Sequence, residues 1–196
     1  MKRVLVTGGT VRLGAAIAEC LRSRGWTVVT SSHRLDSHAD IIADLTKEGA
    51  AERLYAEAGP LDAIVNNASL FKDATERDIR SVGYTAPRKL IESIASSGGA
   101  VVNILDAKIG EGAYYRTKAD LRDYTIEAAK LFAPRLRVNG VSPGSVFAPI
   151  GVHEKAGCNL IGRPKAKDVA LAVAFLLENE SITGVILPVD GGEYIV

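Results

Sequence analysis

A tyrosine and a lysine four residues apart, Tyr114 and Lys118, form the pair in this sequence best suited to acid–base chemistry. A phenol with its ordinary pKa of about 10 is a poor acid or base at neutral pH. A lysine one helical turn away lies on the same face of a helix, where its positive charge would stabilise the phenolate. The alternative is a surface pair with no role, since this spacing also arises by chance. Tyr115, three residues from Lys118, is the competing phenol.

A glycine-rich segment near the start of the chain could bind the phosphates of a dinucleotide. It follows the apolar residues 4–6, precedes a run with helical spacing, and reads Thr7-Gly8-Gly9-Thr10-Val11-Arg12-Leu13-Gly14. Gly8 and Gly9 permit a sharp turn, and Gly14 lets the helix pack close to the strand with its N-terminus toward the phosphates. Arg12 stands where the common pattern has a middle glycine, and it adds a fixed positive charge. The alternative is an ordinary strand-to-helix turn.

The end of the second predicted strand, residues 27–30, bears on the choice of cofactor. Sites specific for NAD place an acid here to hold the ribose hydroxyls, whereas this chain has Ser31 and Ser32. His33 and Arg34, with Arg12 across the site, could instead surround the 2′-phosphate of NADP(H). The alternative is a solvated basic loop. The missing acid favours NADP(H).

Two further strand ends carry polar side chains. Asp44 could accept a hydrogen bond from an adenine amino group while Leu45 flanks the ring, or Asp44 could cap the helix that begins at Thr46-Lys47. Asn66-Asn67-Ala68 follows the fourth predicted strand, where amide side chains can hydrogen-bond neighbouring loops together. Both segments therefore belong in a candidate binding crevice.

Strands that alternate with helices must position these residues. The predicted strands are 4–6, 27–30, 39–43, 61–65, 100–105, 137–141 and 185–189. The predicted helices are 15–21, 47–58, 75–97 with an interruption at Pro87, 114–132 and 167–177. This order predicts an α/β fold with a doubly wound parallel sheet, a Rossmann fold, in one domain over residues 1–196. Residues 146–164 have no clear period, which indicates a mobile flap or a long surface loop.

The composition excludes several classes of function. A net charge of +1 over 196 residues gives no electrostatic case for binding nucleic acid or an anionic membrane. The two cysteines lie far apart without metal-ligand spacing, so no metal site is expected. No apolar leader or membrane-spanning run is present, and we therefore expect a cytoplasmic protein.

Taken in order, several motifs resemble the short-chain dehydrogenase/reductase family over essentially the whole chain. They are Thr7-Gly8 to Gly14, Asn66-Asn67-Ala68, Tyr114-x-x-x-Lys118, Pro143-Gly144 and Asp190-Gly191-Gly192. Within that family the chain is most similar to the pteridine reductases and the related dihydromonapterin reductases. The shared features are Arg12, the turn 31–34, the segment 66–71, and Asp106 where most of the family has serine.

The resemblance implies an NADPH-dependent oxidoreductase that transfers a hydride to a C=N or C=O bond, with a dihydropterin as the best substrate guess. It implies that Tyr114 donates the proton, that Lys118 assists it and binds the nicotinamide ribose, and that Asp106 relays protons and contacts substrate. Phe71 would stack on the pterin. The expected cofactor-binding residues are Gly8, Thr10, Arg12, Leu13, His33, Arg34, Asp44, Leu45, Asn67, Ala68, Ser69, Tyr114, Lys118, Pro143, Gly144 and Ser145. Family members are often homotetramers or homodimers, so self-association is expected.

Two departures from the family pattern keep other functions open. Gly83 stands four residues before Pro87, where the family usually has an asparagine of the proton relay, and only eight residues separate Asp106 from Tyr114. The short separation suggests that Asp106 points differently than in its relatives. The alternatives are a carbonyl or oxoacyl reductase of the same family and a non-catalytic NADP-binding sensor protein.

Overall fold

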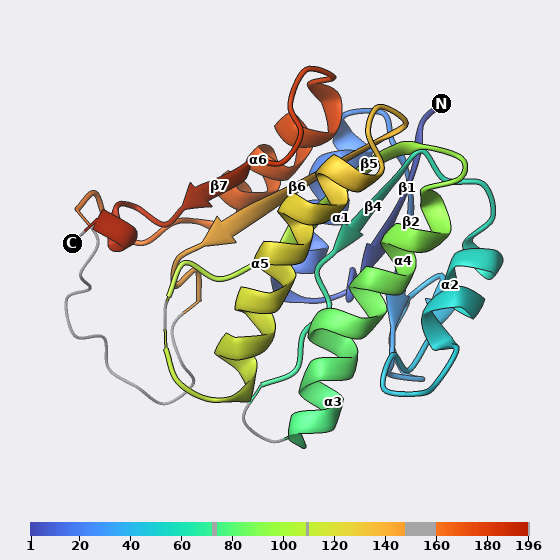
Figure 1. Ribbon diagram of the computed structural model, residues 1–196, viewed down its shortest axis with the longest axis horizontal. Coiled ribbons are helices and arrows are strands. Elements are labelled where there is room, and N and C mark those ends of the chain that lie inside the picture. Colours follow the sequence, from blue (N-terminus) through green and yellow to red (C-terminus); the bar gives the residue numbers. More distant parts are fainter. Residues whose placement is uncertain (72–73, 109, 148–159, 196) are drawn as a thin grey trace.

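The computed structural model describes residues 1–71, 74–108, 110–147 and 160–195. Within these residues a parallel sheet of seven strands runs in the order β3-β2-β1-β4-β5-β6-β7 (Figure 1). The strands are β1 (Arg3–Thr7), β2 (Thr27–Ser32), β3 (Ile41–Ile42), β4 (Ala63–Asn66), β5 (Gly99–Ile104), β6 (Leu136–Pro143) and β7 (Ile186–Val189). The predicted doubly wound parallel sheet is confirmed.

Helices cover both faces of the sheet because strand side chains alternate between two hydrophobic cores. On β1, Leu5 packs into one core, and Val4 and Val6 pack into the other. The Leu5 side is covered by α2 (Ala50–Ala58), α4 (Ala86–Ile94) and α5 (Ala113–Leu131). The opposite side is covered by α1 (Arg12–Ser23) and α6 (Ala166–Glu178), behind the sheet in Figure 1.

The helix predicted over 75–97 contains a π-helical turn at its centre. Its three consecutive segments are α3 (Glu76–Arg80), η1 (Ser81–Thr85) and α4. Pro87 cannot donate to the carbonyl of Gly83, and its ring would clash with that carbonyl in a regular α-helix. A wider turn relieves the clash, so Pro87 explains where the π-helix lies. A Cβ on Gly83 would lie 2.7 Å from Cγ2 of Thr117 on α5, which explains the glycine.

Local hydrogen bonds account for elements that are shorter than predicted. The strand predicted over 39–43 is reduced to β3, because the Asp40 carboxylate accepts from the backbone and hydroxyl of Thr30, at 2.8 and 2.7 Å. Helix α2 begins at Ala50 rather than at 47, because Asp44 and Thr46 form a separate turn. Residues 146–164 are predicted to form a flap or a long surface loop, and residues 148–159 of that segment lie outside the described residues.

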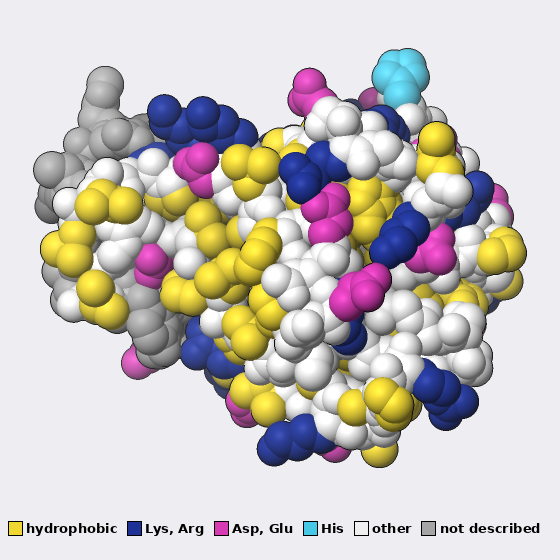
Figure 2. Space-filling model, turned by 90° about the horizontal axis from the view of Figure 1, so that it is seen from above, with side chains coloured by type: hydrophobic (Ala, Val, Ile, Leu, Met, Phe, Trp, Pro, Cys, Tyr) yellow, Lys and Arg dark blue, Asp and Glu magenta, His cyan; other side chains and the backbone are white. Residues whose placement is uncertain are grey.

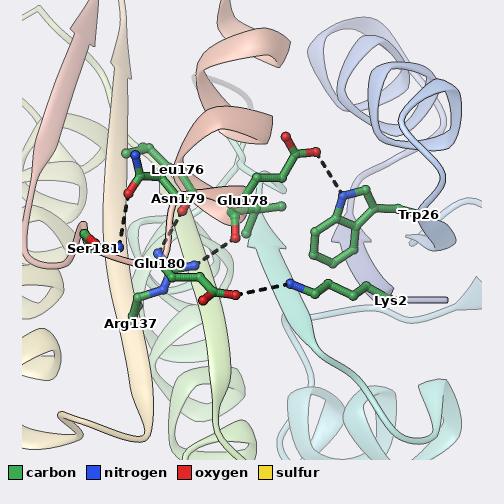
Figure 3. Close-up of polar contacts among 9 residues, drawn as sticks. Lys2, Trp26, Arg137, Leu176, Glu178, Asn179, Glu180 and Ser181 are labelled. Carbon is green, nitrogen blue, oxygen red and sulfur yellow. Dashed lines mark hydrogen bonds and ion pairs between the residues drawn. The ribbon is translucent and has the colours of Figure 1, made fainter.

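The amino-terminal end of the sheet is held by an arginine that caps α6 (Figure 3). Arg137 on β6 donates to the carbonyls of Leu176, Leu177 and Ile182 at 2.9, 2.8 and 2.9 Å. These carbonyls lie at or just beyond the last turn of α6, where helical partners are missing. Nearby, the Lys2 ammonium lies 3.8 Å from the Glu180 carboxylate.

Charges of both signs are interspersed on the face seen in Figure 2, beside a group of hydrophobic side chains. This distribution agrees with the net charge of +1. Across the described ranges, no helix is both long enough and apolar enough to cross a bilayer. The same ranges hold no group of three or more metal-ligating side chains.

Candidate functional site

The turn between β1 and α1 depends on glycine at two positions. Gly8 has a φ of 62°, in the left-handed region that favours glycine. A Cβ on Gly14 would lie 2.0 Å from the carbonyl oxygen of Gly8 and 2.6 Å from Nδ2 of Asn67. Arg12 has a φ of 50°, which explains why the common pattern has glycine at this position.

The loops that follow β1 and β4 are joined through Thr7. Its hydroxyl oxygen accepts from the backbone nitrogens of Asn67 and Ala68, both at 3.0 Å. The Asn67 side chain donates to the carbonyl oxygens of Thr7 and Gly8 at 2.9 and 3.2 Å. The expected tie between adjacent loops is present, and Asn67 makes it.

A cavity of about 500 Å³ lies at the carboxyl ends of β1, β2, β3 and β4, and it includes the point between β1 and β4 where the sheet connections diverge. Such switch points at the carboxyl ends of parallel strands are the usual ligand sites of doubly wound sheets. The cavity is lined by Gly8, Thr10, Val11, Arg12, Leu13, Gly14, Ser31, Ser32, His33, Arg34, Ala43, Asp44, Leu45, Thr46, Asn67, Ala68, Ser69, Leu70 and Val82. The structure thus brings together every predicted cofactor residue from Gly8 to Ser69. Val82, which belongs to η1, also lines the cavity, and no motif in the sequence indicated it as a site residue.

Charged side chains at the β2 end of the cavity are already paired. Arg34 donates from Nε and Nη2 to the two carboxylate oxygens of Asp36, at 3.0 and 2.7 Å. Asp44 accepts from the backbone and hydroxyl of Thr46 at 3.0 and 2.7 Å, and these bonds lower the pKa of its carboxyl. Asp44 therefore caps a local turn and lines the cavity at once. Asp36 was not among the predicted site residues.

Arg12, at the start of α1, also lines the cavity. Its guanidinium stacks over the ring of Phe147, 4.7 Å from the ring centroid. Such a contact holds a cation in place without neutralising its charge. Arg12 therefore keeps its positive charge beside the glycine-rich turn.

The predicted catalytic side chains meet beyond the end of β5. The Tyr114 hydroxyl donates to Oδ2 of Asp106 at 2.9 Å. Asp106 lies two residues after β5, and Tyr114 is the second residue of α5. The separation of eight residues therefore places the phenol and the carboxylate in direct contact.

Lys118 is buried beneath this pair, with 6% of its surface exposed. Its ammonium donates to the carbonyl of Ile104 at 2.7 Å and lies 5.7 Å from the centroid of the Tyr114 ring. Burial lowers the pKa of Lys118 to about 8. Lys118 and Tyr114 thus share one face of α5, as their spacing predicts.

The pKa of Tyr114 moves in the direction opposite to the one expected from the lysine alone. Burial raises it most, and the neighbouring Asp106 carboxylate raises it further. Both effects oppose the phenolate, because one removes water and the other places a negative charge within hydrogen-bonding distance. The phenol therefore keeps its proton at neutral pH.

Two aromatic rings contact the ring of Tyr114. Phe71 meets it edge to face with ring centroids 4.9 Å apart, and Tyr115 does so at 5.2 Å. Phe71 is 48% exposed, so about half of its surface faces solvent. The structure places Tyr115 against the phenol as a neighbour.

The loop after β6 lies beside the same edge of the sheet. The Pro143 carbonyl accepts from the backbone of Ala107 at 2.9 Å, next to Asp106. A Cβ on Gly144 would lie 2.6 Å from the Glu193 carboxylate, which also accepts from the Ser145 backbone at 3.2 Å. Glu193, which was not predicted, therefore positions Gly144 and Ser145.

A buried chain of polar side chains fixes α5 on the sheet. Asn66 and Asn103 are register partners on β4 and β5, and the Asn66 amide donates to Oδ1 of Asn103 at 2.8 Å. The Asn103 amide donates to the Thr125 hydroxyl at 2.8 Å, which in turn donates to the Leu121 carbonyl. These bonds hold α5, and with it Tyr114, in position.

The cavity fits a dinucleotide on the evidence of its walls. The absence of a Cβ at Gly14 lets the glycine turn and Asn67 pack closely, and α1 begins at Arg12, a residue of the lining, so that its positive end lies beside the cavity. Arg12 and Arg34 both belong to the lining and add basic side chains to it. This arrangement suits a ligand with several phosphates.

Comparisons with known proteins agree on one family. A family model described as short chain dehydrogenase matches residues 2–157. Carbonyl reductase family member 4 from Danio rerio is 31% identical over 96% of this chain and 96% of that protein. The 3-oxoacyl-[acyl-carrier-protein] reductase from Rattus norvegicus is 29% identical over 95% of each. The crystal structure of FolM alternative dihydrofolate reductase 1 from Brucella canis complexed with NADP is 28% identical. It superposes with a TM-score of 0.88 over 100% of this chain and 94% of that one.

Proposed function

We propose that this chain, which belongs to the short-chain dehydrogenase family and is an oxidoreductase, is an NADPH-dependent reductase of a C=N or C=O bond. The observation that carries this proposal is the hydrogen bond of 2.9 Å from the Tyr114 hydroxyl to Asp106, beside the buried Lys118. It joins a proton donor to a second group that can exchange protons with the surroundings.

The proposed cofactor is NADP(H). The glycine turn and the lining from Gly8 to Ser69 would hold it. Lys118, which is not part of that lining, would bind its nicotinamide ribose. Support comes from the arginines at the cavity and from the serines at the end of β2. The similar structure from Brucella canis is a complex with NADP. When bound, the reduced dinucleotide supplies the hydride.

Three side chains would take part in the proton transfer. Tyr114 carries it at neutral pH, because burial and Asp106 raise the pKa of the phenol. Lys118 is charged below about pH 8, and its positive charge lowers the cost of releasing that proton. Asp106 accepts the hydrogen bond from the phenol as a carboxylate. After Tyr114 has given its proton to the substrate, Asp106 would take up a proton from solvent water and transfer it to the phenolate, which restores the neutral phenol.

The proposed substrate is a dihydropterin. A flat ring could lie against Phe71, which is half exposed and already packs edge to face on Tyr114. The Asp106 carboxylate can accept hydrogen bonds from the N–H groups of such a ring. Two similar solved structures are described as alternative dihydrofolate reductases, one from Brucella canis and one from Brucella suis.

A carbonyl or oxoacyl reductase is the second candidate, because the similar curated proteins carry those names. A ketone oxygen needs a hydrogen-bond donor, and an ionised Asp106 cannot supply one. With either substrate, Tyr114 would have to turn its hydroxyl away from Asp106 to donate the proton. The third candidate is a non-catalytic NADP-binding sensor. The observation that favours it is Gly83, which has no side chain that could take part in a proton relay.

The deciding experiment follows NADPH oxidation over a panel containing a dihydropterin, dihydrofolate, simple ketones and a β-oxoacyl thioester. We expect turnover of the dihydropterin. Turnover of ketones or thioesters alone refutes the pterin proposal, and NADPH binding without any turnover favours the sensor. Light scattering on the same preparation tests the expected dimer or tetramer.

A further inference from the structure

The arginine placed to meet the 2′-phosphate is already occupied by an acid two residues away. Arg34 donates from Nε and Nη2 to both carboxylate oxygens of Asp36, at 3.0 and 2.7 Å. The turn that presents Asp36 is itself hydrogen-bonded, because the Ser37 hydroxyl donates to the Arg34 carbonyl at 2.7 Å and the Arg34 backbone donates to Ser32. Asp36 is therefore held beside the guanidinium by local structure.

A phosphate would use the same edge of the guanidinium. Two parallel N–H donors of an arginine match the oxygens of a carboxylate and those of a phosphate equally well. The Arg34 and Asp36 side chains are 59% and 70% exposed, so their attraction is weak enough for a competing anion to displace it. Arg34 keeps the pKa of Asp36 below its usual value, so the competitor stays charged.

We infer that Asp36 sets how strongly this chain distinguishes NADPH from NADH, because it competes with the 2′-phosphate for Arg34. This inference rests on the proposed dinucleotide site. NADH lacks the phosphate and leaves the ion pair intact. NADPH must share or displace the carboxylate and also bind beside its negative charge. The preference for NADPH is thus weaker than Arg34 alone would give.

The test is calorimetric titration of the full chain with NADPH and with NADH. We expect Asp36→Asn to bind NADPH roughly three- to tenfold more tightly, the effect of one exposed charge on a phosphate, with NADH binding unchanged. The gain should shrink at high salt. In an Arg34→Ala background the same substitution should increase NADPH affinity less, because no guanidinium remains for Asp36 to occupy.

Glu180→Gln is the matched control. It removes one exposed negative charge that pairs with Lys2 at the opposite end of the strands, and it should leave both affinities unchanged. An unchanged NADPH-to-NADH ratio in Asp36→Asn, weaker NADPH binding, or an equal gain without Arg34 overturns the inference alone. Failure of the wild-type chain to bind either dinucleotide refutes the proposed function, and the inference with it.

Discussion

Replacing Lys118 with methionine should stabilise the fold while removing the activity. Burial lowers the pKa of this lysine from 10.5 to about 8. That difference corresponds to roughly 3 kcal/mol of unfavourable free energy for holding the charge inside the folded chain at neutral pH. Methionine removes the charge and also the hydrogen bond to the Ile104 carbonyl, which contributes about 1 kcal/mol. The net gain in unfolding free energy should be about 2 kcal/mol.

The pH dependence gives the sharper test of this reasoning. The pKa of Lys118 is lower in the folded chain than in the unfolded chain, so the folded chain loses its proton first as pH rises. The penalty is fully present below about pH 8 and disappears toward the unfolded-state pKa. The advantage of Lys118→Met should therefore shrink by about 2 kcal/mol between about pH 7 and about pH 9.5.

Urea unfolding at both pH values measures the gain in unfolding free energy and its change with pH. At neutral pH the midpoint temperature should also rise by about 4–8 °C for a chain of this length. Lys167→Met, at an exposed position of α6, is the control and should show no comparable pH-dependent gain. A Lys118→Met chain that is less stable at neutral pH, or whose stability difference does not change with pH, would refute the reasoning.

Other predictions address the turn, the helix cap and the activity profile. Gly14→Ala should abolish dinucleotide binding in a titration, because its Cβ would lie 2.0 Å from the Gly8 carbonyl oxygen. Arg137→Met should lower the unfolding free energy by about 2 kcal/mol in urea, because three carbonyls near the end of α6 lose a charged donor. Turnover should fall as pH rises through about 8, measured as a pH–rate profile, because Lys118 loses its positive charge there. A rate that stays level past that pH would contradict the role given to Lys118.

The parts of the site that sequence could predict are those fixed by short-range geometry. Gly14 could be predicted because only a residue without a Cβ fits where the helix packs so closely on the turn after the strand. The pairing of Tyr114 with Lys118 could be predicted because residues four apart on a helix share a face. Asn67 could be predicted because it directly follows a strand that ends beside the glycine turn.

The parts that sequence did not reveal depend on contacts between distant or differently turned segments. The raised pKa of Tyr114 depends first on its burial and then on Asp106, which the loop after β5 brings within 2.9 Å of it. Glu193 is 48 residues from Ser145, and no spacing rule relates them. The π-helical turn arises from Pro87, yet a proline alone predicts only a kink or a break.

The central claim is that Tyr114 supplies the proton for a reduction driven by NADPH. The most direct measurement compares wild type with Tyr114→Phe, following both NADPH affinity and dihydropterin-dependent NADPH oxidation. We expect the affinity to change little and turnover to fall by about a hundredfold or more, the usual contribution of a positioned general acid. Turnover that survives the loss of the hydroxyl, with NADPH still bound, would contradict the claim.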